Sequence, residues 1–253
     1  MAVKRGLFVA PFDELMEPGL LAELARSAEL NGWDGFFLWD HLSYRPPVRA
    51  VADPWVALAA IAYATERIRL GPLVTPLSRR RVHKLARETV TLDHLSAGRL
   101  TLGVGLGSSG SGEIERFGEV ADPRERARLL DEGLLVLSEY WNGALDPPPV
   151  QKPRIPIWVA GRWPSRRPVR RAARWDGMFP IELPDPDALA TLAAEVRSLR
   201  PDDAREFDLV AEIPPSSDPS PWSAAGATWV LTSFDSQPHE AEVRAAIAAG
   251  PQT

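Results

Sequence analysis

The sequence predicts an α/β protein with one domain, a (β/α)8 TIM barrel that spans residues 1–253. Short apolar runs alternate along the chain with longer amphipathic stretches, eight of each kind. The apolar runs are continuous, which is typical of parallel strands that helices cover on their outer face. Eight such units in about 250 residues match the usual size of this barrel. A doubly wound open sheet, which has the same local alternation, is the alternative fold.

The first part of the chain contains four predicted strands and three predicted helices. The strands are expected at Gly6–Ala10, Gly35–Trp39, Ile68–Val74 and Arg99–Val104. The helices are expected from Pro18 to Asn31, over Trp55–Thr65, and from Val82 to a stop near Gly98. Apolar residues recur at helical spacing in these stretches. The first stretch opens on a proline, which suits the first helical position, and a glycine follows the end of the first and the third.

The same alternation continues after a long connection over Gly105–Pro123. Four further strands are expected at Pro156–Ala160, Gly177–Ile181, Phe207–Ile213 and Ala227–Thr232. The helices are expected around Leu129–Trp141, Arg167–Arg174, Pro186–Leu199, Pro221–Ala225 and Glu240–Ala249. These segments complete eight strand–helix units.

The composition excludes several classes of protein. The net charge of −5 disfavours nucleic-acid binding, because phosphate backbones favour a basic surface. The chain has no cysteine, which excludes disulfides, a thiolate nucleophile and cysteine-ligated metals. Its four histidines form no HExxH pair, and we expect no metal site. We find no signal peptide and no apolar stretch of spanning length, so we expect a cytoplasmic protein without membrane contact.

Residues 105–110 read Gly-Leu-Gly-Ser-Ser-Gly and formally match the dinucleotide-binding pattern GxGxxG. They follow a strand, but no helix begins at the third glycine. Glu125, about twenty residues further on, lies in a helical stretch and not at the strand end where a ribose needs an acid. We therefore expect a flexible loop at the barrel mouth here. The chain also lacks a GK[ST] triphosphate loop and a GxSxG hydrolase elbow.

Asp40 and His41 stand at the carboxyl end of the second predicted strand, where barrel enzymes place reactive side chains. An aspartate can orient a neighbouring heterocycle by hydrogen bonding. Histidine as a residue type titrates near neutrality, so it suits proton exchange with a bound ring or substrate. From position alone, packing and capping roles explain this pair as well as a catalytic role does.

Four segments resemble, in order, the luciferase-like monooxygenase superfamily, in particular its deazaflavin-dependent branch. They are Gly32–Leu42, Thr65–Arg80, Thr91–Gly107 and Ile155–Gly177. The third segment is the most specific, because it contains the turn LD-x-LS-x-GR before a glycine-rich strand end. Beyond Gly177 the chain resembles the family only in the alternation of strands and helices.

The resemblance implies a barrel that binds FMN or coenzyme F420 in a cleft at the carboxyl ends of the strands. It assigns Asp40 and His41 to the Asp–His pair beside the ring system. It places Leu73–Val74 at a non-proline cis peptide behind the ring. Gly105 and Gly107 then correspond to small residues that leave room for the cofactor.

The cofactor phosphate is expected at the end of the fifth predicted strand. The resemblance places the backbone amide of Gly161 and the basic group of Arg162 there. The residues themselves support this, because Arg162, Arg166 and Arg167 gather just ahead of a predicted helix, and a helix amino terminus is a natural anion site. A solvated basic helix start is the alternative interpretation.

Ser108 is assigned to the cofactor site and is also a departure from the family pattern. The sugar-phosphate dehydrogenases of the deazaflavin branch carry a glutamate there as a general acid. A glucose-6-phosphate type of reaction is therefore disfavoured unless Glu113 or Glu115 of the following loop replaces that glutamate.

The sequence predicts an oxidoreductase in which coenzyme F420 or FMN exchanges hydride with a small organic substrate, or oxygenates it. F420 is slightly preferred, because the Asp–His pair is commoner in that branch. One alternative is an FMN-dependent two-component monooxygenase that receives reduced flavin from a partner reductase. The other is a non-catalytic flavin-binding barrel. Dimers are common among relatives, so a homodimer is one assembly open to this chain, and its oligomeric state is not predicted. The substrate is not predicted.

Overall fold

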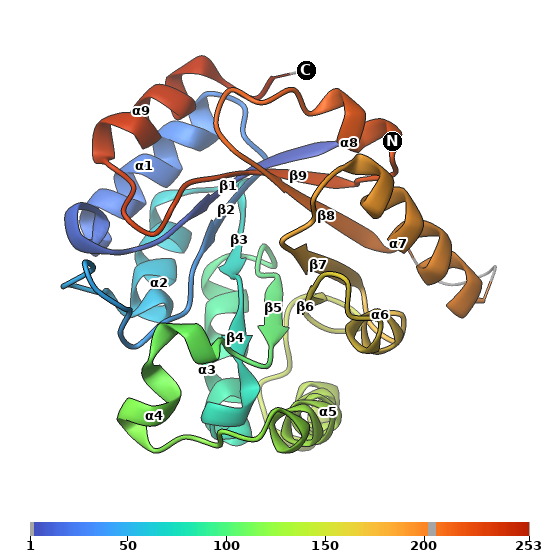
Figure 1. Ribbon diagram of the computed structural model, residues 1–253. Helices are drawn as coiled ribbons and strands as arrows, with labels where there is room; N and C mark the ends of the chain where they lie inside the picture. The colour runs from blue at the N-terminus through green and yellow to red at the C-terminus, as the bar shows by residue number, and fades with distance from the viewer. Residues whose placement is uncertain (1–2, 202–205, 253) are drawn as a thin grey trace.

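The computed structural model describes residues 3–201 and 206–252. Its strands are all parallel and form one sheet in the order β3-β2-β1-β9-β8-β7-β6-β5-β4 (Figure 1). β3 and β4 are consecutive pieces of one barrel strand, separated by Leu73 and Val74. Leu70 in β3 pairs with Leu100, just ahead of β5. The sheet therefore closes on itself, which confirms the predicted barrel and excludes the open doubly wound sheet.

The strands lie close to where the apolar runs predict them. Their bounds are β1 Lys4–Val9, β2 Gly35–Leu38, β3 Arg69–Pro72, β4 Thr75–Pro76, β5 Leu102–Gly105, β6 Ile157–Arg162, β7 Gly177–Ile181, β8 Asp208–Ile213 and β9 Trp229–Ser233. The prediction of one continuous strand over Ile68–Val74 is wrong in one respect. A cis peptide bond joins Leu73 to Val74 and interrupts the ladder there, and this is the cis bond that the family resemblance implies.

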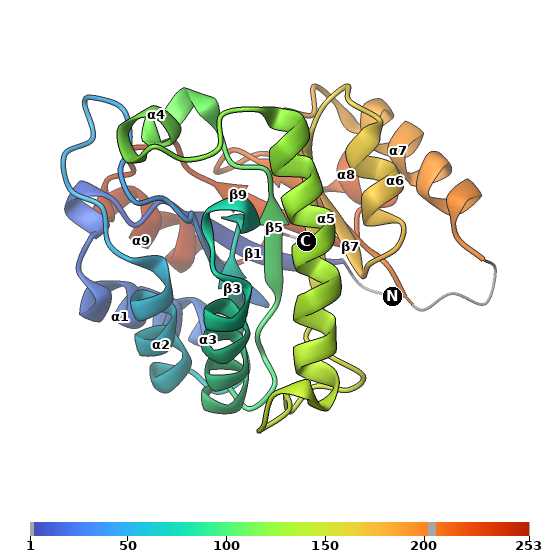
Figure 2. The same ribbon diagram turned by 90° about the horizontal axis from the view of Figure 1, so that it is seen from below.

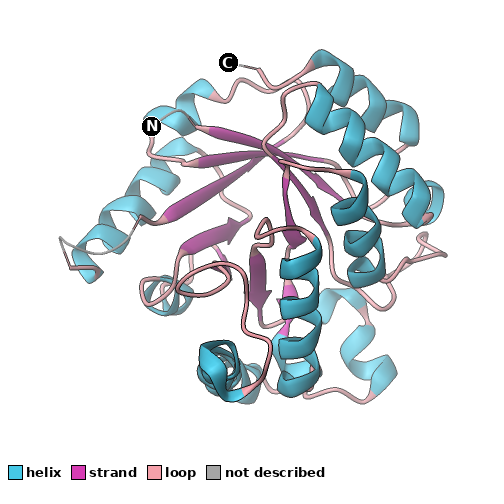
Figure 3. Ribbon diagram, turned by 180° about the vertical axis from the view of Figure 1, so that it is seen from behind, coloured by secondary structure: helices cyan, strands magenta, loops and turns pink. Residues whose placement is uncertain are grey.

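The helices surround the strands (Figure 3). Their bounds are α1 Pro18–Leu30, α2 Pro54–Ala64, α3 Val82–Leu95, α4 Glu113–Phe117, α5 Pro123–Glu139, α6 Arg167–Ala172, α7 Pro186–Leu199, α8 Ser220–Ala224 and α9 Glu240–Ala249. α6 is shorter than the predicted Arg167–Arg174. α4 lies inside the segment expected to be a long connection.

The side chains inside the barrel form a packed core of their own. Phe8, Phe37, Trp158, Phe179 and Trp229 are its largest members, and they come from five different strands. Only the interior of a closed barrel brings side chains from so many strands together. A separate and larger apolar cluster lies between the strands and the surrounding helices. The barrel is therefore filled below its mouth, and any ligand site must lie at one end.

Candidate functional site

The predicted site residues follow the carboxyl ends of four strands. Because all the strands are parallel, these ends meet at one rim. Asp40 and His41 follow β2, the Leu73–Val74 peptide lies between β3 and β4, Gly105 closes β5, and Gly161 with Arg162 closes β6. The structure thus brings the predicted residues to the same end of the barrel. It also shows how each of them is held.

Asp40 is buried, with 2% of its surface exposed, and two arginines share its carboxylate. The Nη2 atoms of Arg79 and Arg80 both lie 2.9 Å from its Oδ1. Its Oδ2 accepts hydrogen bonds from the Thr75 hydroxyl at 2.7 Å and from the Trp55 indole N–H at 3.2 Å. Among the described residues no hydrogen bond joins Asp40 to the ring of its neighbour in the chain. Asp40 therefore anchors the end of β2 to β4 and α2, and its contact with a bound ring stays a prediction.

His41 is held by a buried glutamate from a distant loop. Its Nδ1 lies 2.7 Å from Oε2 of Glu113, whose side chain is only 3% exposed. Glu113 also accepts hydrogen bonds from the backbone N–H groups of Leu42 and Ser43 and from the Ser111 hydroxyl. Glu113 is the first residue of α4, which lies on the same side of the molecule as the loop after β2 (Figure 2). The sequence named Glu113 only as a substitute acid, whereas the structure shows it as the partner of His41.

The surroundings of Glu113 favour its charged form. Burial alone would raise the pKa of this carboxyl. The hydrogen bond and charge of His41, the charge of Arg79 and the N–H of Leu42 outweigh burial and lower the pKa to about 2. Glu113 is then a carboxylate at neutral pH and can only accept hydrogen bonds. Nδ1 of His41 is therefore the donor in this contact, and Nε2 is the ring nitrogen that remains for other partners.

Arg79 joins the two buried carboxylates. Its Nη2 contacts Asp40, and its Nη1 lies 3.1 Å from Oε1 of Glu113. The Arg79 side chain is 7% exposed, so this charge network is almost closed to solvent. Arg79 was not predicted as a site residue, although it lies within the Thr65–Arg80 segment that resembles the family.

Aromatic rings connect His41 to the barrel interior. The ring centroids of Tyr44, Phe12 and Trp39 lie 5.0, 6.0 and 6.0 Å from that of His41. Trp39 in turn lies 5.7 Å from Phe8, which is part of the barrel core. The Nε1 of Trp39 is buried and has no hydrogen-bond partner. The rim beside His41 therefore presents aromatic rings and, at Trp39, a buried N–H without a partner among the described residues.

The glycines at the end of β5 pack against the strand before them. A Cβ at Gly105 would lie 2.8 Å from Cγ2 of Val74, and a Cβ at Gly107 would lie 3.0 Å from Cβ of Pro76. Gly107 also has φ = +78°, a conformation that favours glycine. Chain packing alone accounts for both glycines, so their role in making room for a cofactor stays a prediction. The Ser108 hydroxyl accepts a hydrogen bond from the backbone N–H of Gly110 and caps the turn there.

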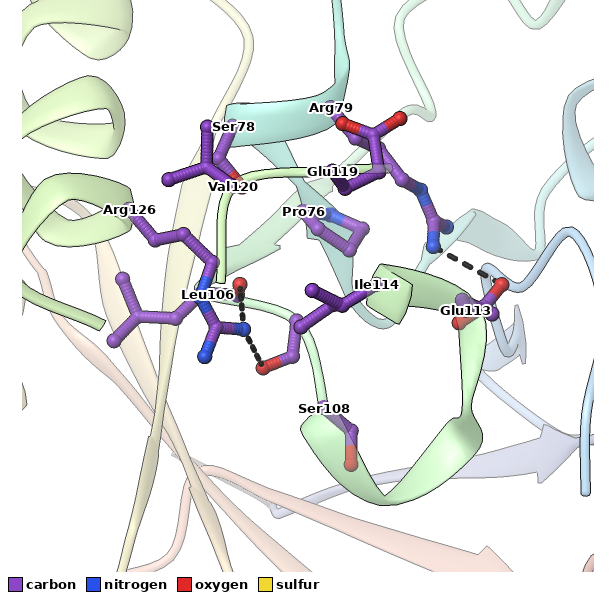
Figure 4. A pocket seen from close by; sticks show the side chains of 11 residues that line it. Pro76, Ser78, Arg79, Leu106, Ser108, Glu113, Ile114, Glu119, Val120 and Arg126 are labelled. Atoms are coloured by element: carbon purple, nitrogen blue, oxygen red, sulfur yellow. Dashed lines mark hydrogen bonds and ion pairs between the residues drawn. The ribbon is translucent and has the colours of Figure 1, made fainter. Parts of the chain in front are cut away.

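A small pocket lies beside this network (Figure 4). Figure 4 shows Arg126 bonded to the carbonyls of Leu106 and Gly107, and Glu113 joined to Arg79. The pocket is lined by Pro76, Ser78, Arg79, Leu106, Gly107, Ser108, Glu113, Ile114, Glu119, Val120 and Arg126. His41 does not line it. The pocket therefore lies behind the rim, on the α4 side of the charge network.

Two of the arginines predicted to bind the phosphate, Arg162 and Arg166, are paired with acids. Arg162 forms an ion pair with Glu182, and both side chains are more than half exposed. Nη1 of Arg166 lies 2.9 Å from Oε2 of Glu195. Helix α6, which begins next to Arg166, has only six residues. A phosphate would have to replace carboxylates at this rim, and the phosphate assignment stays a prediction.

A cluster of metal-ligating side chains and a membrane-spanning helix are two features that the geometry of residues 3–201 and 206–252 can reveal. In these ranges no three His, Cys, Asp or Glu side chains gather in a way that could hold a metal ion. In the same ranges, no helix has the length and apolar character needed to cross a membrane.

Comparisons with known proteins agree on a family. A ketoreductase of phthiodiolone and phenolphthiodiolone dimycocerosates from Mycobacterium kansasii is 31% identical over 224 residues, which are 75% of this chain and 60% of the relative. A 4-hydroxyprotoasukamycin monooxygenase from Streptomyces nodosus subsp. asukaensis is 36% identical over 143 residues, which are 54% of this chain and 37% of the relative. The chain thus spans no more than 60% of the length of these two curated relatives.

Among solved structures, the coenzyme F420-dependent tetrahydromethanopterin reductase from Methanopyrus kandleri superposes with a TM-score of 0.79. The superposition covers 99% of this chain and 98% of the reductase, and the sequences are 16% identical, so it shows a shared fold. Residues 11–251 match the family described as luciferase-like monooxygenase. The chain therefore belongs to the luciferase-like monooxygenase family.

Proposed function

We propose that this chain is an oxidoreductase that binds a flavin or deazaflavin at the barrel rim and transfers hydride to or from a small organic substrate. One observation carries this proposal. The buried Glu113 carboxylate holds His41 by Nδ1, beside aromatic rings at the barrel rim, and so leaves Nε2 for a bound ring or substrate. The family and the names of its members, a ketoreductase and an F420-dependent reductase among them, support the same reading.

The residues at the mouth fit such a cofactor. Trp39, Val74 and Ile181 are partly buried and pack on the barrel core, which gives a flat ring an apolar surface. The unpaired Nε1 of Trp39 is a donor that a polar ring edge could satisfy. At the phosphate end the fit requires an exchange, because a phosphate must displace a carboxylate from Arg162. A guanidinium binds both groups in the same forked geometry, so that exchange is chemically reasonable.

When bound, the ring would supply or accept the hydride. The chain's own residues then do three things. His41 moves a proton at Nε2, next to the ring or the substrate. Glu113 fixes the tautomer and orientation of that imidazole. Asp40 and Arg79 keep the end of β2 and the start of α4 in place, and the aromatic rings around His41 exclude water.

The experiment that tests this proposal follows the reduced cofactor. Purified protein is mixed with reduced F420 or reduced FMN, with and without oxygen, in the presence of candidate carbonyl compounds. Oxidation of the cofactor by a carbonyl compound without oxygen is the expected result. If the protein never accelerates oxidation of either reduced cofactor, by a substrate or by oxygen, a catalytic role is wrong and the non-catalytic flavin-binding barrel is favoured.

A second candidate is an FMN-dependent monooxygenase supplied by a partner flavin reductase. The relative from Streptomyces nodosus, which is named a monooxygenase, favours it. Substrate-dependent oxygen consumption with reduced FMN distinguishes this activity from hydride transfer to a substrate. Turnover that depends on an added reductase would identify the partner.

We also propose a homodimer. Val56 and Tyr63, seven residues apart on the outer face of α2, are 62% and 86% exposed. Large apolar side chains on one outer helix face suit contact with a second copy. Light scattering on the eluting protein gives the mass directly, and a monomer at micromolar concentration would contradict the proposal.

A further inference from the structure

Glu212 is a carboxyl group on the inner wall of the barrel that the proposed function leaves without a role. It lies in β8, where Ala211 and Ile213 pack in the outer core and Val210 belongs to the cluster inside the barrel. Successive side chains of a strand point to opposite faces, so Glu212 points inward like Val210. Because it is the last residue but one of the strand, it lies at the carboxyl-terminal end, where the mouth is.

Glu212 faces the β3–β4 junction across the barrel. In the closed order of strands, β2, β1 and β9 separate the junction from β8 on one side, and β7, β6 and β5 separate them on the other. Val74 and Glu212 are therefore on opposite walls of the mouth. A ring that lies against Val74 would have its other side directed toward Glu212.

The surroundings of Glu212 keep it available and favour its neutral form. Its Oε1 accepts a hydrogen bond from the Ser233 hydroxyl at 2.6 Å, and no described residue bonds to its Oε2. Burial raises the pKa of Glu212, the bond from Ser233 lowers it in part, and the negative charge of Glu182 raises it further. Glu182 follows β7 and is itself paired with Arg162 of β6. On the neighbouring strand β9, Glu212 pairs in register with the apolar Leu231 of the barrel core.

We propose that Glu212 is the proton donor to the substrate and that its carboxyl group protonates the oxygen of a carbonyl compound bound between β8 and the β3–β4 junction. The inference rests on the proposed function and specifies its substrate class. In the reductive direction the carbonyl carbon gains a hydride, and thus two electrons, from the reduced flavin or deazaflavin. The C=O π bond breaks, the oxygen takes the proton of Glu212, and solvent returns a proton to the carboxylate. In the oxidative direction the carboxylate takes the proton of an alcohol.

The first test measures the carboxyl group without any cofactor. Protein labelled with ¹³C at glutamate side-chain carboxyls is titrated by NMR, and the Glu212 signal is identified by its loss in Glu212→Gln. We expect Glu212 to titrate above the ordinary glutamate value of about 4.3. Glu182→Gln is the matched control, because it removes the neighbouring charge and should move the Glu212 titration to lower pH. A Glu212 that titrates in the ordinary range overturns the proposal.

The second test is kinetic and separates this proposal from the one on which it rests. With cofactor bound and a carbonyl compound that turns over, Glu212→Gln should lower kcat by about 10²-fold and leave the cofactor Kd within a few-fold of wild type. The fall in wild-type kcat at high pH, as Glu212 ionises, should be absent in the variant. An unchanged kcat and pH profile overturns the role of Glu212 and leaves the proposed function intact. If neither cofactor binds the wild-type protein, the proposed function itself is wrong.

Discussion

The charge of Glu113 should contribute measurably to stability, and replacing it with glutamine tests this. The side chain keeps its size in Glu113→Gln but loses its charge, and one accepting oxygen becomes an NH2 donor. The pKa of Glu113 is lowered from 4.5 to about 2, and each unit corresponds to about 1.4 kcal/mol of free energy. Part of the lowering comes from the charge of His41 and holds only when that ring is charged, so we count less than the full shift. We therefore expect Glu113→Gln to lower the free energy of unfolding by about 2–3 kcal/mol at pH 7.

The pH dependence gives the sign of this effect. Because the pKa in the folded state is lower than in the unfolded state, the stabilisation is complete above the unfolded value of 4.5 and is lost as pH falls toward about 2. Urea unfolding of the wild type and of Glu113→Gln should thus differ most at pH 6–7 and converge progressively below pH 4.5. A difference that stays constant from pH 7 to pH 3.5 would refute the reasoning, since it would show that packing and not charge is lost.

Three further predictions follow from the site. His41→Gln should lower turnover by about 10²-fold, with little change in the cofactor Kd measured by fluorescence. Arg162→Ala should weaken the binding of FMN by about 10-fold, which is the low end of the effect of a charge-assisted hydrogen bond. Riboflavin, which lacks the phosphate, should bind both proteins equally. An equal loss of riboflavin affinity would show that Arg162 maintains the shape of the pocket instead of binding the phosphate. Gly105→Ala should destabilise the protein by about 1–3 kcal/mol, because the new Cβ would lie 2.8 Å from Val74. Gly19→Ala is the control, because no atom lies within 4 Å of the added Cβ, and it should be neutral or stabilising by up to about 1 kcal/mol. Equal shifts in the melting temperature of Gly105→Ala and Gly19→Ala would contradict this reasoning.

The alternation of apolar runs was sufficient to predict a parallel sheet covered by helices, because such strands require continuous apolar sequence. It did not by itself separate the barrel from a doubly wound open sheet, and the number of units and the family resemblance favoured the barrel. The alternation also did not predict α4. This five-residue helix lies between Gly112 and Gly118, both of which adopt left-handed conformations, and is too short to show an apolar period. The run of apolar residues did not predict the split between β3 and β4 either, because Leu73 and Val74 continue that run without a break. The cis bond there came from the family resemblance alone.

The site was predicted in position and not in its contacts. Asp40 and His41 lie at the expected strand end, but their partners are set by tertiary structure. Glu113 is 72 residues from His41 along the chain, and no local pattern links the two. Glu212 could have been noticed from the sequence, because it is two residues from Val210 in a predicted strand and so lies on the same face. A charged side chain on the inner face of a barrel is unusual. Whether a strand residue faces inward becomes certain only once the core contacts are known.

The central claim is that the rim beside His41 binds a flavin or deazaflavin, and the most direct measurement is a titration of purified protein with oxidised F420 and FMN. Absorbance and fluorescence report binding of either ring. We expect saturable, stoichiometric binding of at least one of them with a Kd in the micromolar range or below, which corresponds to a binding free energy of about −8 kcal/mol. Binding of neither at protein concentrations approaching millimolar would contradict it.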